Sequence, residues 1–214
     1  MINNLSNKGK KLIELYKKMA SEGYERNDET HIENAFSDFE SRFYRKQIKE
    51  LLSKFGVESI LDYGCGGSNW SLENFDESGL SAKDFYNLKK CLRFEPARAI
   101  DERALVDCVI NFDVLEHIFV ADVPLIIEDI FKYAIKLVII NVACYPAAAK
   151  LPNGENAHIT VRSPFWWKAQ IDNIAIKYPN ISVQLLTSIG WRKTQGFPIF
   201  KAKDWLESKS FITE

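Results

Sequence analysis

The sequence has few cysteines, and none stand in a pair that suggests a metal ribbon or a redox centre. The four cysteines are Cys65, Cys91, Cys108 and Cys144, and no two form a Cys-x-x-Cys pair. This spacing argues against a zinc ribbon and a thioredoxin-like motif. Scattered cysteines are typical of proteins in a reducing compartment, so we expect a cytoplasmic protein.

The sequence also lacks a long apolar run and an excess of charge of one sign. Its longest apolar run, residues 137–144, is interrupted by Asn141 and is far too short to span a bilayer. The polar, lysine-rich residues 1–11 are not followed by the apolar core of a signal peptide. The net charge of −1 provides no overall attraction to nucleic acid or an anionic membrane. We therefore expect no membrane partner, and a small-molecule substrate in preference to nucleic acid.

Repeats, low-complexity tracts and linkers are absent as well, whereas core-forming residues are plentiful. Hydrophobic residues make up 46% of the 214 residues, and 14 of the residues are Phe. A chain of this length and composition fits one globular domain with a sizeable core. We expect a single domain over residues 1–214, with N-terminal helices in 1–56 and an α/β core in 57–214.

Strand and helix patterns alternate along the α/β core. Apolar residues at helical spacing predict helices near residues 12–19, 39–55, 123–134 and 164–174. Short apolar or β-branched runs predict strands at 57–63, 88–94, 105–112, 137–142, 180–186 and 196–200. Gly56 is placed to end a helix, and Asp122 to cap one. This alternation predicts a doubly wound, mostly parallel sheet with an N-terminal helical extension.

A run of small residues follows the first core strand, at Gly64, Cys65, Gly66, Gly67 and Ser68. Glycines let the backbone approach a ligand more closely than side chains would allow. A glycine turn after a strand is shared with dinucleotide-binding folds and ordinary tight turns, so alone it says little. The whole segment 62–68, however, resembles the D-x-G-C-G-x-G signature of the class I S-adenosylmethionine-dependent methyltransferases, with Ser68 in place of the last glycine.

Two later segments extend this resemblance in the same order along the chain. Glu95 follows the second strand, where family members place an acid whose carboxylate accepts hydrogen bonds from the ribose hydroxyls. The segment 113–118 resembles the D-V-L-E-H-I segment that borders the transferred methyl group. The resemblance covers roughly residues 57–145 and implies a Rossmann-like methyltransferase fold that binds S-adenosylmethionine. The cofactor-binding residues that it implies are Asp62, Tyr63, Gly64, Cys65, Gly66, Glu95 and Asp113.

The interval between Glu95 and Asp107 departs from the family pattern. It is too short for the usual helix, third strand and adenine-binding acid. The sheet is therefore expected to lack a strand on this side, and the adenine contact stays unassigned, with Asp101 as a candidate.

A metal site is a further expectation. If a helix begins near Asp113, then Asp113, Glu116 and His117 share one helical face. His158 lies in the loop after the next strand and would reach the same crevice. Carboxylates and imidazoles together can hold Mg²⁺ or Mn²⁺. The set is similar to that of the small-RNA 2′-O-methyltransferases and the ubiquinone-pathway O-methyltransferases, although Asp113 replaces their Glu, and similar segments also occur in metal-free relatives.

These patterns predict a methyltransferase that acts on an oxygen or nitrogen of a small molecule, with metal assistance as an option. If no metal binds, His117 or His158 is the expected general base, with Glu116 as the third catalytic residue, because imidazole titrates near neutral pH. Two alternatives stay open: an RNA 2′-O-methyltransferase and a non-catalytic S-adenosylmethionine-binding module. A nicotinamide-dependent oxidoreductase fits the motifs less well. The sequence does not identify the acceptor or the oligomeric state.

Overall fold

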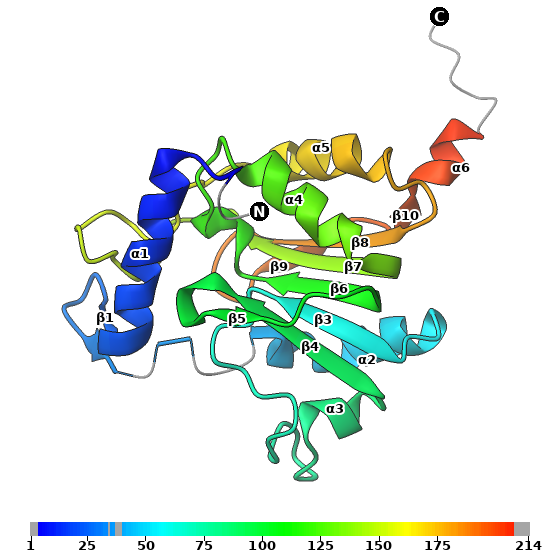
Figure 1. The fold of residues 1–214 in the computed structure, drawn as a ribbon, viewed down its shortest axis with the longest axis horizontal. Helices are drawn as coiled ribbons and strands as arrows, with labels where there is room; N and C mark the ends of the chain where they lie inside the picture. Colours follow the sequence, from blue (N-terminus) through cyan, green and yellow to red (C-terminus); the bar gives the residue numbers. More distant parts are fainter. Residues whose placement is uncertain (1–3, 34, 37–39, 208–214) are drawn as a thin grey trace, which may run out of the picture.

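The protein has an α/β fold with a mixed, mostly parallel central sheet, which is compatible with a Rossmann-like fold (Figure 1). The structure is a computed structural model and describes residues 4–33, 35–36 and 40–207. The helices are α1 (Asn7–Glu22), α2 (Arg45–Lys54), α3 (Ala82–Phe85), α4 (Val123–Lys132), α5 (Pro164–Ala175) and α6 (Ala202–Leu206), and the 3₁₀ turns are η2 (Glu40–Tyr44), η3 (Pro96–Arg98) and η4 (Leu115–His117). The strands of the main sheet are β3 (Ser59–Tyr63), β4 (Lys90–Glu95), β5 (Ile100–Asp101), β6 (Val106–Phe112), β7 (Ala134–Ala143), β8 (Ser182–Ser188), β9 (Thr194–Gly196) and β10 (Phe200–Lys201).

The order of the parallel strands places a ligand crevice between β3 and β6. Across the sheet they run β4-β3-β6-β7-β8, which in order along the chain is 2-1-3-4-5. The antiparallel strand β5 flanks β4, and β9 and β10 both pair with β8. In open sheets of this kind, ligands bind outside the carboxyl ends of the strands where the strand order reverses. Here the segments that follow β3 and β6 meet at that reversal.

Alternate residues of the central strands supply the two faces of the core. Helices α4 and α5 cover one face, and α2 and α3 lie on the other (Figure 1). Toward α4 and α5 the strands present Leu61, Val109, Val138, Ile140 and Val183. Toward α2 and α3 they present Ile60, Cys108, Ile110, Leu137 and Ile139. Burial on both faces explains why the β6 and β7 segments are mostly apolar.

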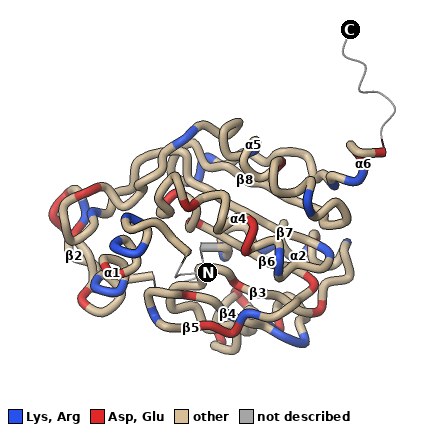
Figure 2. The backbone as a smooth tube through the Cα atoms, turned by 45° about the horizontal axis from the view of Figure 1, so that its top comes forward, with Lys and Arg blue, Asp and Glu red and all other residues tan. Residues whose placement is uncertain are grey.

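Helix α1 stands apart from these two layers, across the ends of the strands (Figure 1). Its residues Leu12 and Met19 pack on Ala147, Leu151 and Ala157 of the loop after β7. No described helix has both the length and the apolar character needed to cross a membrane. Basic and acidic positions are interspersed along the chain (Figure 2).

The sequence predicts that Asp122 caps α4, but its side chain does not do so. It occupies the N-cap position, but its carboxylate makes no capping hydrogen bond. Instead it accepts hydrogen bonds from the N–H and hydroxyl of Ser6, at 2.8 and 2.7 Å. The same hydroxyl accepts from the Gly9 N–H at 3.0 Å and so caps α1. Asp122 therefore anchors α1 to the start of α4.

Most other predicted elements are confirmed, with differences where strands are short. Gly56 ends α2 with the predicted left-handed backbone, at a φ of 56°. The predicted strand at 196–200 is in fact two short strands, β9 and β10. The segment between α1 and η2 contains the two-residue antiparallel strands β1 (Tyr24–Glu25) and β2 (His31–Ile32). The short interval after β4 forms β5 and no third parallel strand, as expected.

The first prediction concerns Asp107, which ties β3 to β6. Its carboxylate accepts from the Glu58 N–H at 2.9 Å and the Ser59 N–H at 3.1 Å, and pairs with Lys136 at 2.9 Å. Partial burial opposes ionisation, but these partners outweigh it and lower the pKa of Asp107 below its usual value. The resulting stability is therefore present above about pH 4 and is lost as the pH falls through the lowered pKa.

We expect Asp107→Asn to lower the free energy of unfolding at pH 7 by about 1 to 2 kcal/mol. The variant should also lose less stability than wild type on acidification from about pH 5 to 3, because it has no carboxylate to protonate there. Urea unfolding of both proteins at about pH 7, 5 and 3 measures the two effects. Equal acid sensitivity of the two proteins would contradict the role given to Asp107.

Candidate functional site

A cavity of about 910 Å³ lies at the carboxyl ends of β3, β4 and β6, beneath α1. This is within the size range of small-molecule and cofactor sites. Every residue that the sequence assigns to cofactor binding lines it, and so do His117 and His158. Those cofactor-binding residues are Asp62, Tyr63, Gly64, Cys65, Gly66, Glu95 and Asp113. Glu116 lies behind the cavity wall and is not among the lining residues.

The backbone N–H groups of the glycine loop, residues 64–68, are all bonded to acceptors within the protein. They donate from Gly64 and Cys65 to Phe94 O, from Gly66 to Glu95 Oε2, from Gly67 to Phe36 O and from Ser68 to Cys65 O. A loop that binds phosphate has to direct such N–H groups toward the ligand. The glycine loop therefore contributes to the wall of the cavity, but it has no free N–H groups with which to bind a phosphate.

The glycines in the loop are required by its contacts with other protein segments. Gly64 has a φ of 87°, and a Cβ at this position would clash with the Val114 side chain that follows β6. Gly66 has a φ of 54°, and its Cβ would lie 2.6 Å from Phe36 O. The sequence prediction attributed these glycines to close approach of a ligand. In the structure, close approach of neighbouring backbone and side chains already accounts for both.

Asp62 and Glu95 support the loop as well as lining the cavity. Asp62 Oδ2 accepts from Ser68 Oγ at 2.9 Å and Trp70 Nε1 at 3.0 Å. Burial raises the pKa of Asp62 to about 6, although these two hydrogen bonds act against the rise. Glu95 accepts the Gly66 N–H at 3.2 Å on one oxygen and the Ala97 N–H at 2.9 Å on the other, and burial raises its pKa too.

The helix predicted to begin near Asp113 is a single 3₁₀ turn, η4. Asp113 precedes that turn with a left-handed backbone, at a φ of 50°. The expectation that Asp113, Glu116 and His117 share one α-helical face is therefore wrong. Asp113 nevertheless lies close enough to Glu116 and His158 for its charge to act on the pKa of each.

Glu116 is completely buried and joins three segments. Its Oε1 accepts the N–H of Ala143, at the end of β7, at 2.7 Å, and its backbone carbonyl accepts the N–H of Thr160 at 2.9 Å. The other carboxyl oxygen, Oε2, is buried and accepts no hydrogen bond from an N–H or hydroxyl group of the described chain, and the Asp113 carboxyl group lies close enough to share a proton with that of Glu116. A buried carboxyl group with so few hydrogen-bond donors is unfavourable for stability, so it marks a candidate ligand contact.

The two histidines of the cavity are oriented in the same way. His117 Nδ1 lies 2.9 Å from Ala157 O, and His158 Nδ1 lies 2.5 Å from Tyr145 O. A carbonyl oxygen can only accept a hydrogen bond, so the form of each ring that makes these bonds carries its proton on Nδ1. The Nε2 atom of each neutral ring then has a free lone pair, which is the arrangement found in metal-binding and proton-accepting histidines.

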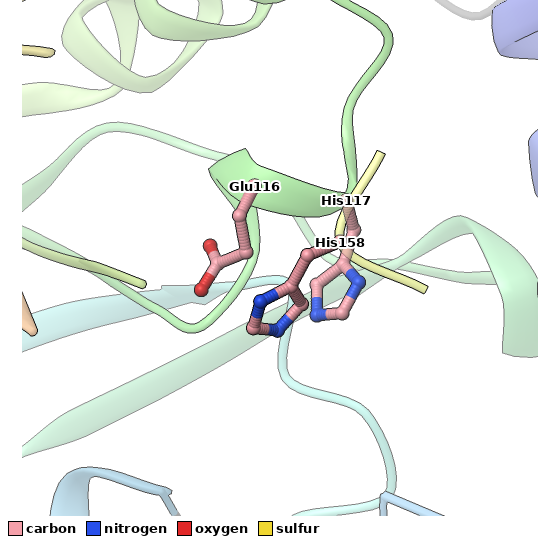
Figure 3. Close-up of side chains that lie close together, drawn as sticks. All are labelled: Glu116, His117 and His158. Carbon is pink, nitrogen blue, oxygen red and sulfur yellow. The ribbon is translucent and has the colours of Figure 1, made fainter. Parts of the chain in front are cut away.

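Glu116, His117 and His158 form a cluster, referred to below as the Glu–His cluster (Figure 3). One ligand atom from each lies within 4.8 Å of the others, and the two imidazole rings meet edge to face with centroids 4.9 Å apart. The structure thus brings together three of the four predicted metal ligands. Asp113, the fourth, is beside the cluster but does not belong to it.

Burial disfavours the charged form of each group in the cluster. It lowers the pKa of His117 to about 3, with repulsion from a charged His158 adding to the effect, and it also lowers the pKa of His158. Burial, and then repulsion from Asp113, raise the pKa of Glu116 well above its usual value. A bound divalent ion reverses this preference for a carboxyl group, because it stabilises the ionised form.

Two residues with a predicted ligand contact have side chains that are bonded within the protein. Tyr63 lines the cavity, but its hydroxyl donates to Asp129 Oδ2 at 2.8 Å. Asp101, the candidate for the adenine contact, pairs with Arg103 at 2.6 Å and is not among the cavity-lining residues.

Tyr16 of α1 is the site residue that the sequence did not reveal. Its hydroxyl lies 2.7 Å from His117 Nδ1. In the sequence Tyr16 is one apolar position of an amphipathic helix, which carries no signal of such a contact.

No protein-family model, curated protein or solved structure matches the chain. The function is therefore inferred from the residues and the geometry of the site.

The second prediction compares two glycines with nearly the same backbone conformation. Gly64 and Gly154 have φ values of 87° and 85°, but a Cβ at Gly154 meets nothing within 4 Å. We expect Gly154→Ala to cost about 1 kcal/mol of stability, from the backbone conformation alone. Gly64→Ala should cost at least about 2 kcal/mol more, because it also forces Val114 to move. Thermal and urea unfolding measure both, and equal losses would show that the Val114 contact is unimportant.

Proposed function

We propose that the chain is an S-adenosylmethionine-dependent methyltransferase with a Rossmann-like class I fold and a small-molecule oxygen or nitrogen acceptor. The observation that carries the proposal is the convergence of three sequence-distant segments on one cavity. The glycine loop, Glu95 and the Asp113 segment follow β3, β4 and β6, and all three line the cavity at the strand reversal. Strand order alone is compatible with many ligands, so the proposed ligand follows from these side chains.

The chemistry of the cavity wall favours a cationic cofactor without phosphate. The occupied N–H groups of the glycine loop argue against the pyrophosphate of a nicotinamide cofactor. The carboxyl groups of Asp62, Glu95 and Asp113 outnumber the guanidinium groups of Arg26 and Arg98 in the cavity wall, and a positive charge nearby would favour the ionised forms of the three acids. S-Adenosylmethionine has a sulfonium cation and no phosphate, so it suits such a wall. Glu95 would accept hydrogen bonds from the ribose hydroxyls with the lone pairs that the backbone N–H groups leave free.

The Glu–His cluster fits a divalent metal ion. It offers a buried carboxyl group on Glu116 and two imidazoles whose Nδ1 atoms face carbonyl groups. This mixed set of nitrogen and oxygen donors suits Mn²⁺ better than Mg²⁺, which prefers oxygen ligands. A metal ion bound there would lower the pKa of an acceptor hydroxyl group.

The residues of the chain itself contribute orientation and proton acceptance. Methyl transfer needs an acceptor aligned with the methyl group and deprotonated as it attacks. Without a metal, His117 is a poor base because burial lowers its pKa to about 3. His158 is therefore assigned as the proton acceptor, with the Tyr145 carbonyl keeping its Nε2 lone pair available. Glu116 holds η4 against β7 and thereby fixes the position of His117.

The walls of the cavity near α1 favour a small, largely apolar acceptor. They are lined mostly by aliphatic and aromatic side chains, namely Leu12, Ile13, Phe36, Phe119 and Ala147. Helix α1 covers this part and limits the size of a substrate that can enter. Enclosed apolar pockets with a few polar groups are typical of small-molecule sites.

An RNA 2′-O-methyltransferase is the second candidate, and one surface feature favours it. Trp191, which lines the cavity, is 68% exposed, and Phe43 is 53% exposed. The Arg192 guanidinium lies 5.2 Å from the ring centroid of each. Exposed aromatic and arginine groups stack on nucleobases. Methylation of an RNA end that falls steeply with added salt would favour this candidate over the first. A binding-only module would bind the cofactor and show no methyl transfer to either class.

The third prediction tests the cofactor assignment. Glu95→Ala should weaken binding of S-adenosylhomocysteine by at least about tenfold, because hydrogen bonds to a charged group are lost. Asp101→Ala removes an acid from the neighbouring strand, outside the cavity, and should leave the affinity unchanged. Titration calorimetry measures both, with circular dichroism to confirm folding. Wild-type affinity in a folded Glu95→Ala variant would refute the assignment.

The fourth prediction tests the metal. His158→Ala should weaken Mn²⁺ binding by more than about a hundredfold, because losing a ligand costs more than losing the hydrogen bond that orients one. The matched control is His31→Ala, since His31 is exposed on β2 and pairs with Glu25. Mn²⁺ titration followed by electron paramagnetic resonance gives both affinities. Undiminished binding in His158→Ala would remove the metal from the proposal.

A further inference from the structure

Trp191 is the most exposed of the tryptophans that the structure describes, and it lines the cavity. It is 68% exposed, whereas Trp70 and Trp167 are buried in the core. A single exposed apolar residue is ordinary on a protein surface. Trp191 differs from such a residue because it also belongs to the wall of the cavity. Its exposed ring is therefore available to a ligand that occupies the cavity.

The position of Trp191 is fixed by the turn between β8 and β9. The Ile189 N–H donates to Lys193 O at 2.9 Å and closes this turn. Thr194, the first residue of β9, is hydrogen-bonded through its hydroxyl to the hydroxyl of Tyr44, which immediately precedes α2. The turn is thereby tied to a second part of the chain, so Trp191 is held at the cavity before any ligand binds. Such preorganisation lowers the cost of binding.

Arg192 restricts the kind of group that can bind at Trp191. Its guanidinium carbon lies 5.2 Å from the ring centroid of Trp191 and 5.2 Å from that of Phe43, which is 53% exposed. A cationic ligand group on Trp191 would be repelled by this charge. A neutral planar ring, by contrast, can stack on an indole ring and also on a guanidinium group. The surroundings of Trp191 therefore favour a neutral aromatic ring.

The strand order places Trp191 away from the proposed cofactor residues. Asp62 and Glu95 belong to the ends of β3 and β4, whereas Trp191 follows β8, at the other end of the parallel strand order. The segments that carry the Glu–His cluster follow β6 and β7, which lie between β3 and β8. Neighbouring strands are about 4.8 Å apart, so β3 and β8 are separated by about 14 Å. A ring on Trp191 would thus belong to the methyl acceptor and not to the cofactor.

We propose that Trp191 is a specificity-determining residue that stacks on a planar aromatic ring of the methyl acceptor. The acceptor is a small aromatic molecule whose hydroxyl or amino group is directed toward the Glu–His cluster. The role as an acceptor rests on the proposed function, whereas the binding of an aromatic ring at Trp191 does not. Aromatic pairing commonly strengthens binding by about 3- to 10-fold beyond the effect of apolar contact. A nucleobase would supply the same kind of ring, so the test has to separate these two sources.

The test uses protein labelled with 5-fluorotryptophan and three probes. 2-Naphthol is a planar aromatic alcohol, and 2-decalol is its saturated counterpart of similar size. Hexa-adenylate supplies nucleobases on a ribose-phosphate chain. Fluorine NMR resolves the five tryptophans, and the spectrum of Trp191→Phe identifies the resonance of Trp191. The shift of this resonance during a titration shows where each probe binds.

Saturation-transfer NMR of the probes gives the affinity of each variant. The matched control is Phe165→Leu, because Phe165 is 74% exposed but is not among the cavity-lining residues. We expect 2-naphthol to shift the Trp191 resonance selectively and to bind at least about threefold more tightly than 2-decalol. Trp191→Leu should remove this preference, and Trp191→Phe should keep most of it because a ring remains. Phe165→Leu should bind both probes as wild type does.

Three results would overturn the proposal. They are an unshifted Trp191 resonance with 2-naphthol, equal affinities of wild type for 2-naphthol and 2-decalol, or an equal loss of affinity in Phe165→Leu. The first two are measured on wild-type protein and so do not depend on the folding of a variant. Tighter binding of hexa-adenylate than of 2-naphthol at Trp191 would overturn the small acceptor and support the RNA candidate.

A titration of wild type with S-adenosylhomocysteine separates this inference from the proposed function. Binding of 2-naphthol at Trp191 without binding of S-adenosylhomocysteine would refute the methyltransferase and leave the aromatic site standing. Binding of S-adenosylhomocysteine without a shift of the Trp191 resonance by 2-naphthol would refute the aromatic site alone.

Discussion

The candidate site depends on the buried carboxyl group of Glu116. The hydrogen bond from Ala143 to this group joins the turn after β6 to the end of β7, and the Glu116 carbonyl joins the same turn to Thr160, near His158. Both histidines of the cavity therefore sit on segments that Glu116 holds together. Complete burial of this carboxyl group beside that of Asp113 is unfavourable for folding, and such costs are concentrated where function requires them.

The strand reversal between β3 and β6 imposes the second constraint. It brings the glycine loop against Val114, and only a residue without a Cβ can occupy position 64 in that conformation. Because the N–H groups of the glycine loop are already bonded to acceptors within the protein, the loop presents no anion site. Under the proposed function, Asp62, Glu95 and Asp113 in the cavity wall would recognise a cofactor that carries a positive charge. The requirement for glycine at position 64 is therefore one of packing within the protein.

Much of the fold could be predicted because its signals are local. β6 and β7 are mostly apolar runs, and Ser163 caps α5 through a hydrogen bond from the Trp166 N–H, as a sequence pattern can indicate. The convergence of the cofactor residues also followed from their places at the ends of adjacent parallel strands. The helix predicted at Asp113 failed because helical spacing says nothing about the left-handed backbone there.

Contacts between residues far apart in the chain could not be predicted from the sequence. Nothing near Asp122 indicates that Ser6 would take its carboxylate, and nothing near Tyr16 indicates His117, which is 101 positions away. These contacts arise only when α1 packs across the ends of the strands. His117 and His158 could be expected to lie together because they follow neighbouring strands, whereas the position of Asp113 outside the Glu–His cluster depends on tertiary geometry.

The central claim is that the cavity binds S-adenosylmethionine through its carboxylates and does not bind a pyrophosphate cofactor. Titration calorimetry of the wild-type protein with S-adenosylhomocysteine, with and without Mn²⁺, and with NAD⁺ in parallel, tests it most directly. The account predicts micromolar binding of S-adenosylhomocysteine at one site per chain and no detectable binding of NAD⁺. Binding of NAD⁺ with no binding of S-adenosylhomocysteine, or no binding of either, would contradict it.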